Sequence, residues 1–377
     1  MKPIPPASSR LFWLVLATTA SITAMADTAD ISQVPLGTSS GRAKPNIMFI
    51  LDDSGSMDSK YMPDEMSDSG KYGYWSAQCN GVAYDPTVQY DPPVDYQGIA
   101  YPNATFTDAW RDGYNTAGSK TNLNTSVSDA TYYRYTGSQP KMGWVFKANG
   151  SVDTTSTFYA ECMTATSSSG PFTAVRVTST STDAQNYANW FAYYRTRMNL
   201  MRTAVGRAFK SLDSNYRVGF TVISDSSVSG SHFLDVDDFT GGDQGQKALF
   251  YQKLYTVFDK NYTPLRAALS KVGRYYGLSA PGQTSTQNPI QHSCQRNYAI
   301  LSTDGYWNTD IETGTYGPFA LNGTNVGQQD GDEVRPMKDS TVTTVTTITG
   351  TRRTDRRTYT GTASLTGGKV RRTATQV

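Results

Sequence analysis

A short loop around residue 52 carries the side chains with the clearest chemical potential. An apolar run ends at Leu51, and Asp52, Ser54 and Ser56 follow it at alternate positions. Alternate residues of a tight loop can converge on one point, and a carboxylate with two hydroxyls offers the hard oxygen ligands that Mg²⁺ or Ca²⁺ prefers. The spacing predicts a divalent metal site, although the same residues also occur in ordinary polar turns. Asp53 points the other way along a strand pleat and is left out.

Two later segments of the chain also place oxygen-bearing side chains next to a predicted strand or helix. A second apolar run, 297–301, continues into Ser-Thr-Asp-Gly and places Asp304 just beyond a strand. Thr263 precedes Pro264 at the start of a predicted helix, where proline is favoured. Ligands of open α/β sheets lie beyond the carboxyl ends of the strands. We therefore expect Asp304 and Thr263 to complete the site.

In chain order, these three loops resemble the metal-ion-dependent adhesion site of von Willebrand factor A domains: D-x-S-x-S, a threonine that opens a helix, and a strand that ends in T-D-G. The resemblance implies that Ser54 and Ser56 bind the metal directly. It implies that Asp52, Thr263 and Asp304 bind directly or through water, and that an acidic group of a protein partner takes the open position.

The segments between these loops alternate between helix and strand patterns. Apolar residues at three- and four-residue steps predict one amphipathic helix from Asp183 to Leu212. A central strand at 217–223, a shorter strand at 232–236 that could be an antiparallel edge, and a helix at 243–258 follow. This order predicts an α/β fold with a doubly wound, mostly parallel sheet, which the resemblance identifies as Rossmann-like and of the von Willebrand factor A type.

Residues 58–182 interrupt this alternation with a large irregular insert after the first strand. The insert is rich in Tyr, Gly, Pro and Asp, a composition that favours turns and short strands. Its tyrosines could form a contact surface for a partner. They could equally pack against one another in a disulfide-linked subdomain, since the sequence does not distinguish exposed from buried aromatic residues.

The N-terminus predicts export. Basic residues precede an apolar run that ends in an A-x-A cleavage site, which indicates a signal peptide over 1–26, followed by a linker at 27–44. No later segment has the roughly 20 consecutive apolar residues of a transmembrane helix. In an oxidising compartment two of the three cysteines should pair. Cys79 and Cys162, both in the insert, are the favoured pair, and we expect Cys294 to be the unpaired cysteine.

Charge separates the tail from the body of the chain. Residues 341–377 carry a net charge of +6, while residues 1–340 carry −4. The Thr- and Arg-rich tail has few large apolar residues, so we predict that it is disordered and separate from a domain at 45–340. Basic charge alone carries little specificity, and nucleic acid is not an expected partner of an exported protein.

Several motifs resemble the N-terminal region of the PilY-type family of type IV pilus assembly and tip-adhesin proteins. They include C-N-G-V-A-Y-D-P from Cys79, Y-D-P-P from Tyr90, A-W-R-D-G-Y from Ala109, and the block from C-Q-R-N-Y at Cys294 to T-D-G-Y-W-N. The likeness covers about residues 35–340, without the C-terminal propeller of that family. It implies adhesion or pilus assembly through the metal site, with a host or surface receptor or minor pilins as partner. It places the protein in the periplasm, on the outer surface or at the pilus tip of a Gram-negative bacterium.

Two other classes of protein remain alternatives. An exported von Willebrand factor A scaffold of an envelope complex unrelated to pili has the same site. A secreted hydrolase is disfavoured because Ser54 lacks the G-x-S-x-G elbow, and only His232 and His292 are available as a base. We therefore expect no enzymatic activity.

Overall fold

The computed structural model describes residues 43–148, 150–257, 262–292 and 294–305, and the backbone of 346–352, 355–366 and 369–376. The predicted signal peptide at 1–26, most of the linker at 27–44, and residues 306–340 lie outside these ranges. Among the helices that the structure describes, none is both long enough and apolar enough to cross a membrane.

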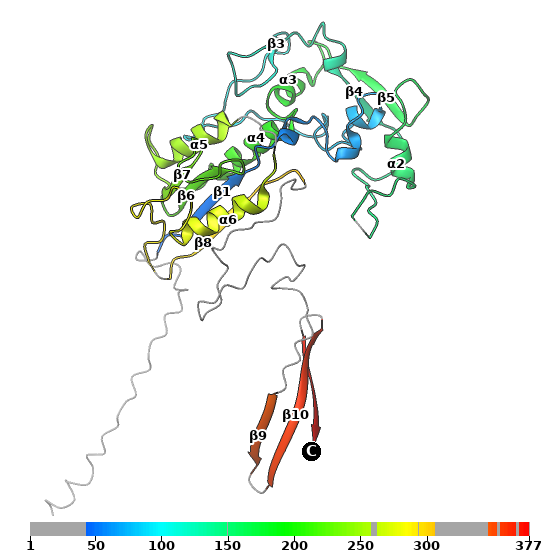
Figure 1. Cartoon of the computed structure of the whole chain (residues 1–377). Coiled ribbons are helices and arrows are strands. Elements are labelled where there is room, and N and C mark those ends of the chain that lie inside the picture. The colour runs from blue at the N-terminus through cyan, green and yellow to red at the C-terminus, as the bar shows by residue number, and fades with distance from the viewer. Residues whose placement is uncertain are drawn as a thin grey trace, which may run out of the picture. The chain divides into compact units, whose positions relative to one another are not determined.

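The strand that leads to Asp52 is an inner strand of a four-stranded sheet (Figure 1). From one edge to the other, its strands are β7 (Leu234–Asp238), β6 (Arg217–Val222), β1 (Asn46–Leu51) and β8 (Asn297–Leu301). β1 pairs in parallel with β6 and β8, whereas β7 pairs antiparallel to β6 at the edge. The α/β class and the mostly parallel sheet that the sequence predicts are confirmed.

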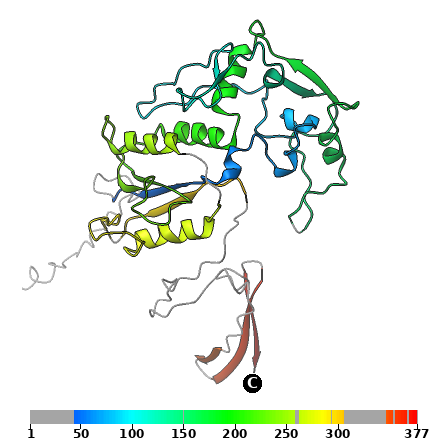
Figure 2. The ribbon, with the colours of Figure 1, turned by 45° about the horizontal axis from the view of Figure 1, so that its top comes forward.

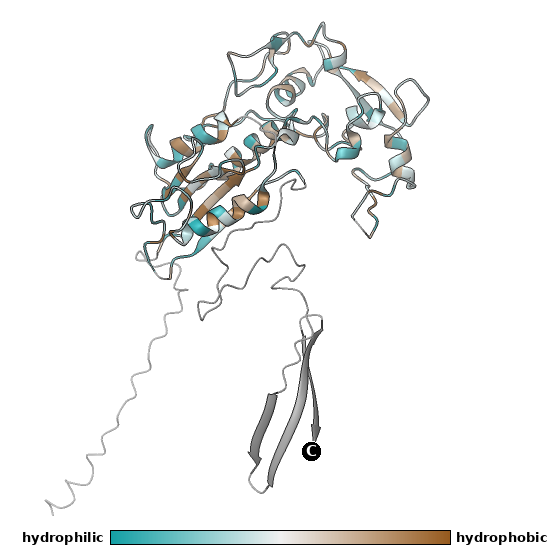
Figure 3. Ribbon diagram, in the orientation of Figure 1, coloured by the Kyte–Doolittle hydropathy of each residue, from teal (hydrophilic) through white to brown (hydrophobic). Residues whose placement is uncertain are grey.

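Helices cover both faces of this sheet (Figure 2). They are α4 (Arg197–Phe209), α5 (Gln246–Thr256) and α6 (Leu265–Tyr276). Met48 and Ile50 of β1 pack against α6, and Phe49 and Leu51 pack on the opposite face against α4 and α5. Because successive side chains of a strand point to opposite faces, a strand covered on both sides must be apolar throughout. Figure 3 shows this apolar character along the central strands.

The single helix predicted from Asp183 to Leu212 is wrong, because the chain forms two helices there. The first is α3 (Ala184–Tyr193), and the second is α4. The backbone is extended at Thr196, whose hydroxyl oxygen accepts a hydrogen bond of 3.1 Å from the N–H of Asn199 and caps α4. The apolar stripes of the two helices pack into different cores. The spacing of apolar residues along the sequence therefore did not reveal the break between α3 and α4.

Short elements make up the segment between β1 and α3, and they include helices as well as the turns and short strands that the sequence predicts, so the expected absence of helices is wrong. They are the 3-10 helices η1 (Gly55–Asp58), η2 (Asp64–Met66), η3 (Tyr72–Trp75) and η4 (Ser128–Ala130), the strands β2 (Ala109–Trp110), β3 (Lys120–Thr121), β4 (Thr131–Tyr135) and β5 (Phe172–Arg176), and the helix α2 (Thr157–Cys162). Tyr84, at 1% exposure, packs against Tyr187 and Trp190 of α3. Of the two roles considered for the insert's aromatic residues, packing in a core therefore applies to Tyr84. That core extends past residue 182 into α3.

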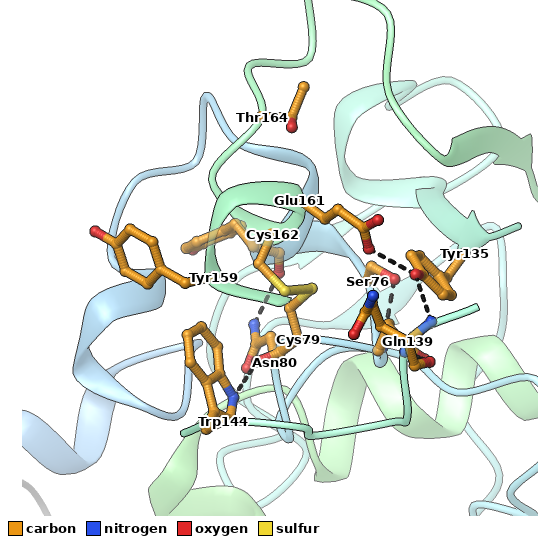
Figure 4. Close-up of a disulfide and its surroundings, with 12 residues drawn as sticks. Ser76, Cys79, Asn80, Tyr135, Gln139, Trp144, Tyr159, Glu161, Cys162 and Thr164 are labelled. Atoms are coloured by element: carbon orange, nitrogen blue, oxygen red, sulfur yellow. Dashed lines mark hydrogen bonds between the residues drawn. A yellow bond between two sulfur atoms is a disulfide. The ribbon is translucent and has the colours of Figure 1, made fainter. Parts of the chain in front are cut away.

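A disulfide joins Cys79 to Cys162, the pair favoured from the sequence (Figure 4). Both cysteines are at most 1% exposed, and they connect the loop after η3 to the end of α2 across 83 residues. Trp144 donates from Nε1 to the carbonyl oxygen of Cys79 at 3.2 Å. A Cβ at Gly73 would lie only 2.6 Å from the carbonyl oxygen of Cys162, so glycine is required there. Cys294 is an exposed free cysteine.

The tail contains strands where the sequence predicts disorder over 341–377. β9 (Thr346–Arg352), β10 (Asp355–Thr366) and β11 (Lys369–Gln376) form a three-stranded antiparallel sheet. A segment that buries little apolar area can still form strands. Its β-branched threonines favour strands, and the Gly-Gly pair between the paired residues Thr366 and Lys369 is a typical hairpin signal.

Candidate metal centre

The loops after β1 and β8 lie side by side at the carboxyl edge of the sheet. Ile50 of β1 pairs in register with Leu301 of β8. The N–H of Ser302 then donates to the carbonyl oxygen of Ile50 at 3.0 Å. The loop that begins at Asp52 and the loop that carries Asp304 therefore start from adjacent, parallel strands. This edge is where open α/β sheets hold their ligands.

Asp52 is fully buried, and only one of its two carboxylate oxygens accepts a hydrogen bond from the described residues. Its Oδ1 accepts the backbone N–H of Ser54 at 2.8 Å, and this bond closes the loop. Its Oδ2 is buried and has no hydrogen-bond partner among the described residues. A buried carboxylate oxygen without a donor is costly unless a cation or a proton compensates it. The Oδ2 of Asp52 is therefore an acceptor that a cation or a proton would satisfy.

The two serine hydroxyls connect the first loop to Asp304. Ser54 Oγ lies 3.0 Å from Ser56 Oγ, and Ser56 Oγ donates to Asp304 Oδ1 at 3.0 Å. Ser54 is the N-cap of η1, yet its side chain makes no capping hydrogen bond. Its hydroxyl is directed to Ser56 instead. The structure thus brings Asp52, Ser54, Ser56 and Asp304 together, as the sequence predicts for a metal site.

Thr263 lies just before α6 and is 5% exposed. Further along α6, Lys271 donates to the carbonyl oxygen of Val222, the last residue of β6, whereas Tyr276 donates to Tyr298 near the beginning of β8. The helix therefore runs antiparallel to the strands. Its N-terminal end, with Thr263, points toward the edge that carries the other candidate ligands.

Asp53 is engaged elsewhere, in agreement with its exclusion from the predicted site. Its carboxylate accepts hydrogen bonds from the backbone N–H of Ser224 at 3.0 Å and from the Ser224 hydroxyl at 2.5 Å. These contacts join the loop after β1 to the loop after β6. Burial lowers the pKa of nearby Lys271 to about 8, and the charges of Asp225 and Asp53 partly oppose that shift.

The donors at this edge suit a hard divalent cation. All are oxygens, from two carboxylates and the serine and threonine hydroxyls, which is the ligand type of Mg²⁺ and Ca²⁺. Among the described residues, no group of three or more His, Cys, Asp or Glu side chains could hold a metal ion. The buried Oδ2 of Asp52 is the feature that a cation would satisfy. The residues present therefore fit the predicted ion.

Comparisons with known proteins agree with the resemblance. The chain is 32% identical over 305 residues to the type IV pilus biogenesis factor PilY1 of Pseudomonas aeruginosa strain PAO1. It is 34% identical over 295 residues to that of strain UCBPP-PA14, and each match covers 74% of this chain. This chain belongs to the PilY-type family. It spans about a quarter of the length of the PilY-type relatives that it matches. No protein-family model and no solved structure match it.

Sequence reasoning missed one residue that contacts the candidate site, Arg197. Its guanidinium donates to Asp304 Oδ2 and to Asp64 Oδ1, each at 2.6 Å, and to the carbonyl oxygen of Tyr61 at 2.6 Å. Burial alone would lower its pKa, but the hydrogen bonds and charges of Asp64 and Asp304 outweigh that effect and raise the pKa. Arg197 thus offsets the charge of Asp304 and links it to the insert. In the helix predicted from Asp183 to Leu212, Arg197 falls outside the apolar stripe, and nothing in the sequence pairs it with Asp304.

Proposed function

We propose that this chain contains the metal-dependent adhesion domain of an exported type IV pilus assembly protein, and that the domain is of the von Willebrand factor A type. The buried, unsatisfied Oδ2 of Asp52 beside Ser54, Ser56 and Asp304 carries the proposal. The relatives are named pilus biogenesis factors, which supports a role in pilus assembly. The protein would act in the periplasm, on the outer surface or at the pilus tip of a Gram-negative bacterium.

Asp52, Ser54, Ser56, Thr263 and Asp304 would hold Mg²⁺ or Ca²⁺. Such an ion supplies an open coordination position with affinity for a carboxylate. Because Arg197 offsets Asp304, the protein contributes few net negative charges there. An incoming acidic side chain is therefore not repelled. We propose that the partner is a protein that presents such a side chain, either a host or surface receptor or a minor pilin.

Two alternatives predict different behaviour. A scaffold of an envelope complex unrelated to pili would use the same site, and its loss would leave pili intact. A secreted hydrolase would need a base at Ser54. The hydroxyl of Ser54 lies beside that of Ser56, whereas His232 lies near Asp225, with Nδ1 3.8 Å from Oδ1. This arrangement favours binding over catalysis.

The first prediction concerns the stabilising effect of the cation. Millimolar Mg²⁺ or Ca²⁺ should raise the thermal midpoint of the mature chain, because an ion at about 100 times its Kd stabilises the folded state by about 2.7 kcal/mol. Asp52→Ala should abolish this shift. Differential scanning fluorimetry with and without EDTA measures both.

Asp68→Asn is the matched control. Asp68 is a carboxylate with 56% side-chain exposure that lies near Lys71 and is not one of the candidate ligands, so its loss should leave the metal shift unchanged. Equal stabilisation of wild type and Asp52→Ala by the cation would refute the assignment of Asp52.

The second prediction tests function in cells that carry a deletion of the gene. Complementation with Thr263→Ala or Asp304→Ala should abolish chelator-sensitive surface attachment, because each substitution removes a metal ligand from a different loop. Attachment assays and surface pilus counts, scored together, separate adhesion from assembly.

The wild-type gene and Asp68→Asn serve as controls in the same strain. Attachment that is indifferent to EDTA and to both substitutions would reject the metal-dependent mechanism. Normal pilus number and attachment in the deletion strain itself would favour the envelope scaffold unrelated to pili.

A further inference from the structure

A second polar site lies at the N-terminal end of α4. It is a cavity of about 260 Å³, and none of the five candidate metal ligands lines it. Its charged lining consists of Lys60, Arg111, Arg195 and Arg202, with Asp58 and Asp112. Cations thus outnumber carboxylates in the lining. A cavity with this balance favours an anionic occupant.

Arg195 is the central observation. It is 8% exposed, and its guanidinium lies 4.0 Å from the ring centroid of Phe191. Its Nη2 donates to the carbonyl oxygen of Arg111 at 2.8 Å, while its buried Nε has no hydrogen-bond partner among the described residues. The described residues also give Arg195 no ion pair within 4.0 Å. The charge of Asp129, and less strongly that of Asp58, offsets the cost of burying this guanidinium only in part, and a bound anion would compensate the remainder.

The neighbouring cations divide into two groups. Arg111 is paired with Asp129 at 3.0 Å, and Arg202 lies 3.8 Å from Asp112. Lys60 is exposed as a residue and makes no ion pair with the described residues. Desolvation of its amino group by the surrounding protein, together with the charge of Arg195, lowers its pKa. Arg195 and Lys60 are the two cations that remain. The exposed carboxylate of Asp58 offsets one of these two positive charges. An excess of positive charge therefore remains around Arg195 and Lys60.

The helix adds to this field. Thr196 is the N-cap of α4, a helix of 13 residues, and Thr196 and Asn199 both line the cavity. The N-terminal end of a helix carries a partial positive charge and favours anions. Arginine presents its donors in a planar fork that matches the oxygens of a phosphate or sulfate.

We propose that this cavity binds a tetrahedral oxyanion, a phosphate or sulfate group, between Arg195 and Lys60 at the N-terminal end of α4. The group can be a free ion or an ester on a larger molecule. This site is independent of the proposed metal function, since it uses none of the metal ligands.

Isothermal titration of the mature chain with inorganic phosphate at constant ionic strength tests the proposal. We expect saturable binding in the range up to about 10 mM, weakened at least about tenfold by Arg195→Gln and by Lys60→Gln. Lys60 is exposed and unpaired in the described structure, so Lys60→Gln keeps the test valid if Arg195→Gln misfolds. Arg134→Gln removes the same charge from an exposed position on β4 and should leave the affinity unchanged.

Further titrations distinguish the source of the ligand and the site. Tighter binding of glycerol phosphate than of inorganic phosphate would identify an ester as the ligand, and the reverse order would identify the free ion. Binding should persist in EDTA and in Asp52→Ala. The absence of saturable binding, equal weakening by Arg134→Gln, or loss of binding in EDTA would each overturn the proposal.

Discussion

Replacing Arg197 with methionine should lower the free energy of unfolding by about 3–5 kcal/mol, because it leaves a buried carboxylate without its counter-charge. The side chains of Arg197 and Asp304 are 3% and 5% exposed and lie 2.6 Å apart. Methionine retains part of the aliphatic volume but none of the charge. Urea denaturation in EDTA measures this loss without a contribution from bound metal.

Asp64→Asn is the matched control for this variant. Asp64 also lies 2.6 Å from Arg197, but its side chain is 65% exposed. Exposed ion pairs contribute about 0–1 kcal/mol, so this variant should be nearly as stable as wild type. If Arg197→Met costs no more than Asp64→Asn, the pair with Asp304 does not stabilise the fold. Saturating Mg²⁺ should restore part of the stability of Arg197→Met, since a bound cation would compensate Asp304.

Loss of the disulfide should have an effect of similar size. The double variant Cys79→Ala, Cys162→Ala should lower the free energy of unfolding by about 4–5 kcal/mol, because the bridge closes a long loop and restricts the unfolded chain. The two cysteines are 83 residues apart in the sequence. Because the insert has little regular structure, we expect limited proteolysis to cut residues 58–182 first. Guanidinium denaturation measures the total loss.

Cys294→Ser provides the control, because Cys294 is exposed and unbridged. It should behave as wild type in both assays. A double variant as stable as Cys294→Ser would show that the insert is held by its aromatic packing alone. Peptide mapping without reduction that joined Cys79 to Cys294 would refute the pairing itself.

The strands and the loops that carry the candidate metal ligands could be predicted because their signals are local. β1 must be apolar on both faces, so its run ends visibly where Asp52 begins. The same reasoning placed β6, the antiparallel edge strand and β8 close to their observed positions. The convergence of Ser54, Ser56 and Asp304 follows from parallel strands that end at one edge.

The features that sequence reasoning missed depend on contacts between distant segments. A continuous apolar stripe predicts a helix but not which core each half enters, so the cap at Thr196 was not recognised. Arg197 contacts Asp304, 107 residues away, and no spacing rule connects them. The strands of the tail pair backbone with backbone, which a count of buried apolar residues does not detect.

The parallel pairing of β1 with β8 also determines how the domain bears tension. The described chain enters β1 at Asn46 and leaves β8 after Leu301, at opposite ends of two adjacent strands. A pull on the chain from both sides therefore slides β1 against β8 along their length. The hydrogen bonds between them must then break together, not one after another as in a hairpin that unzips. Forced unfolding depends on this barrier and not on equilibrium stability, so the domain can resist load while remaining only moderately stable.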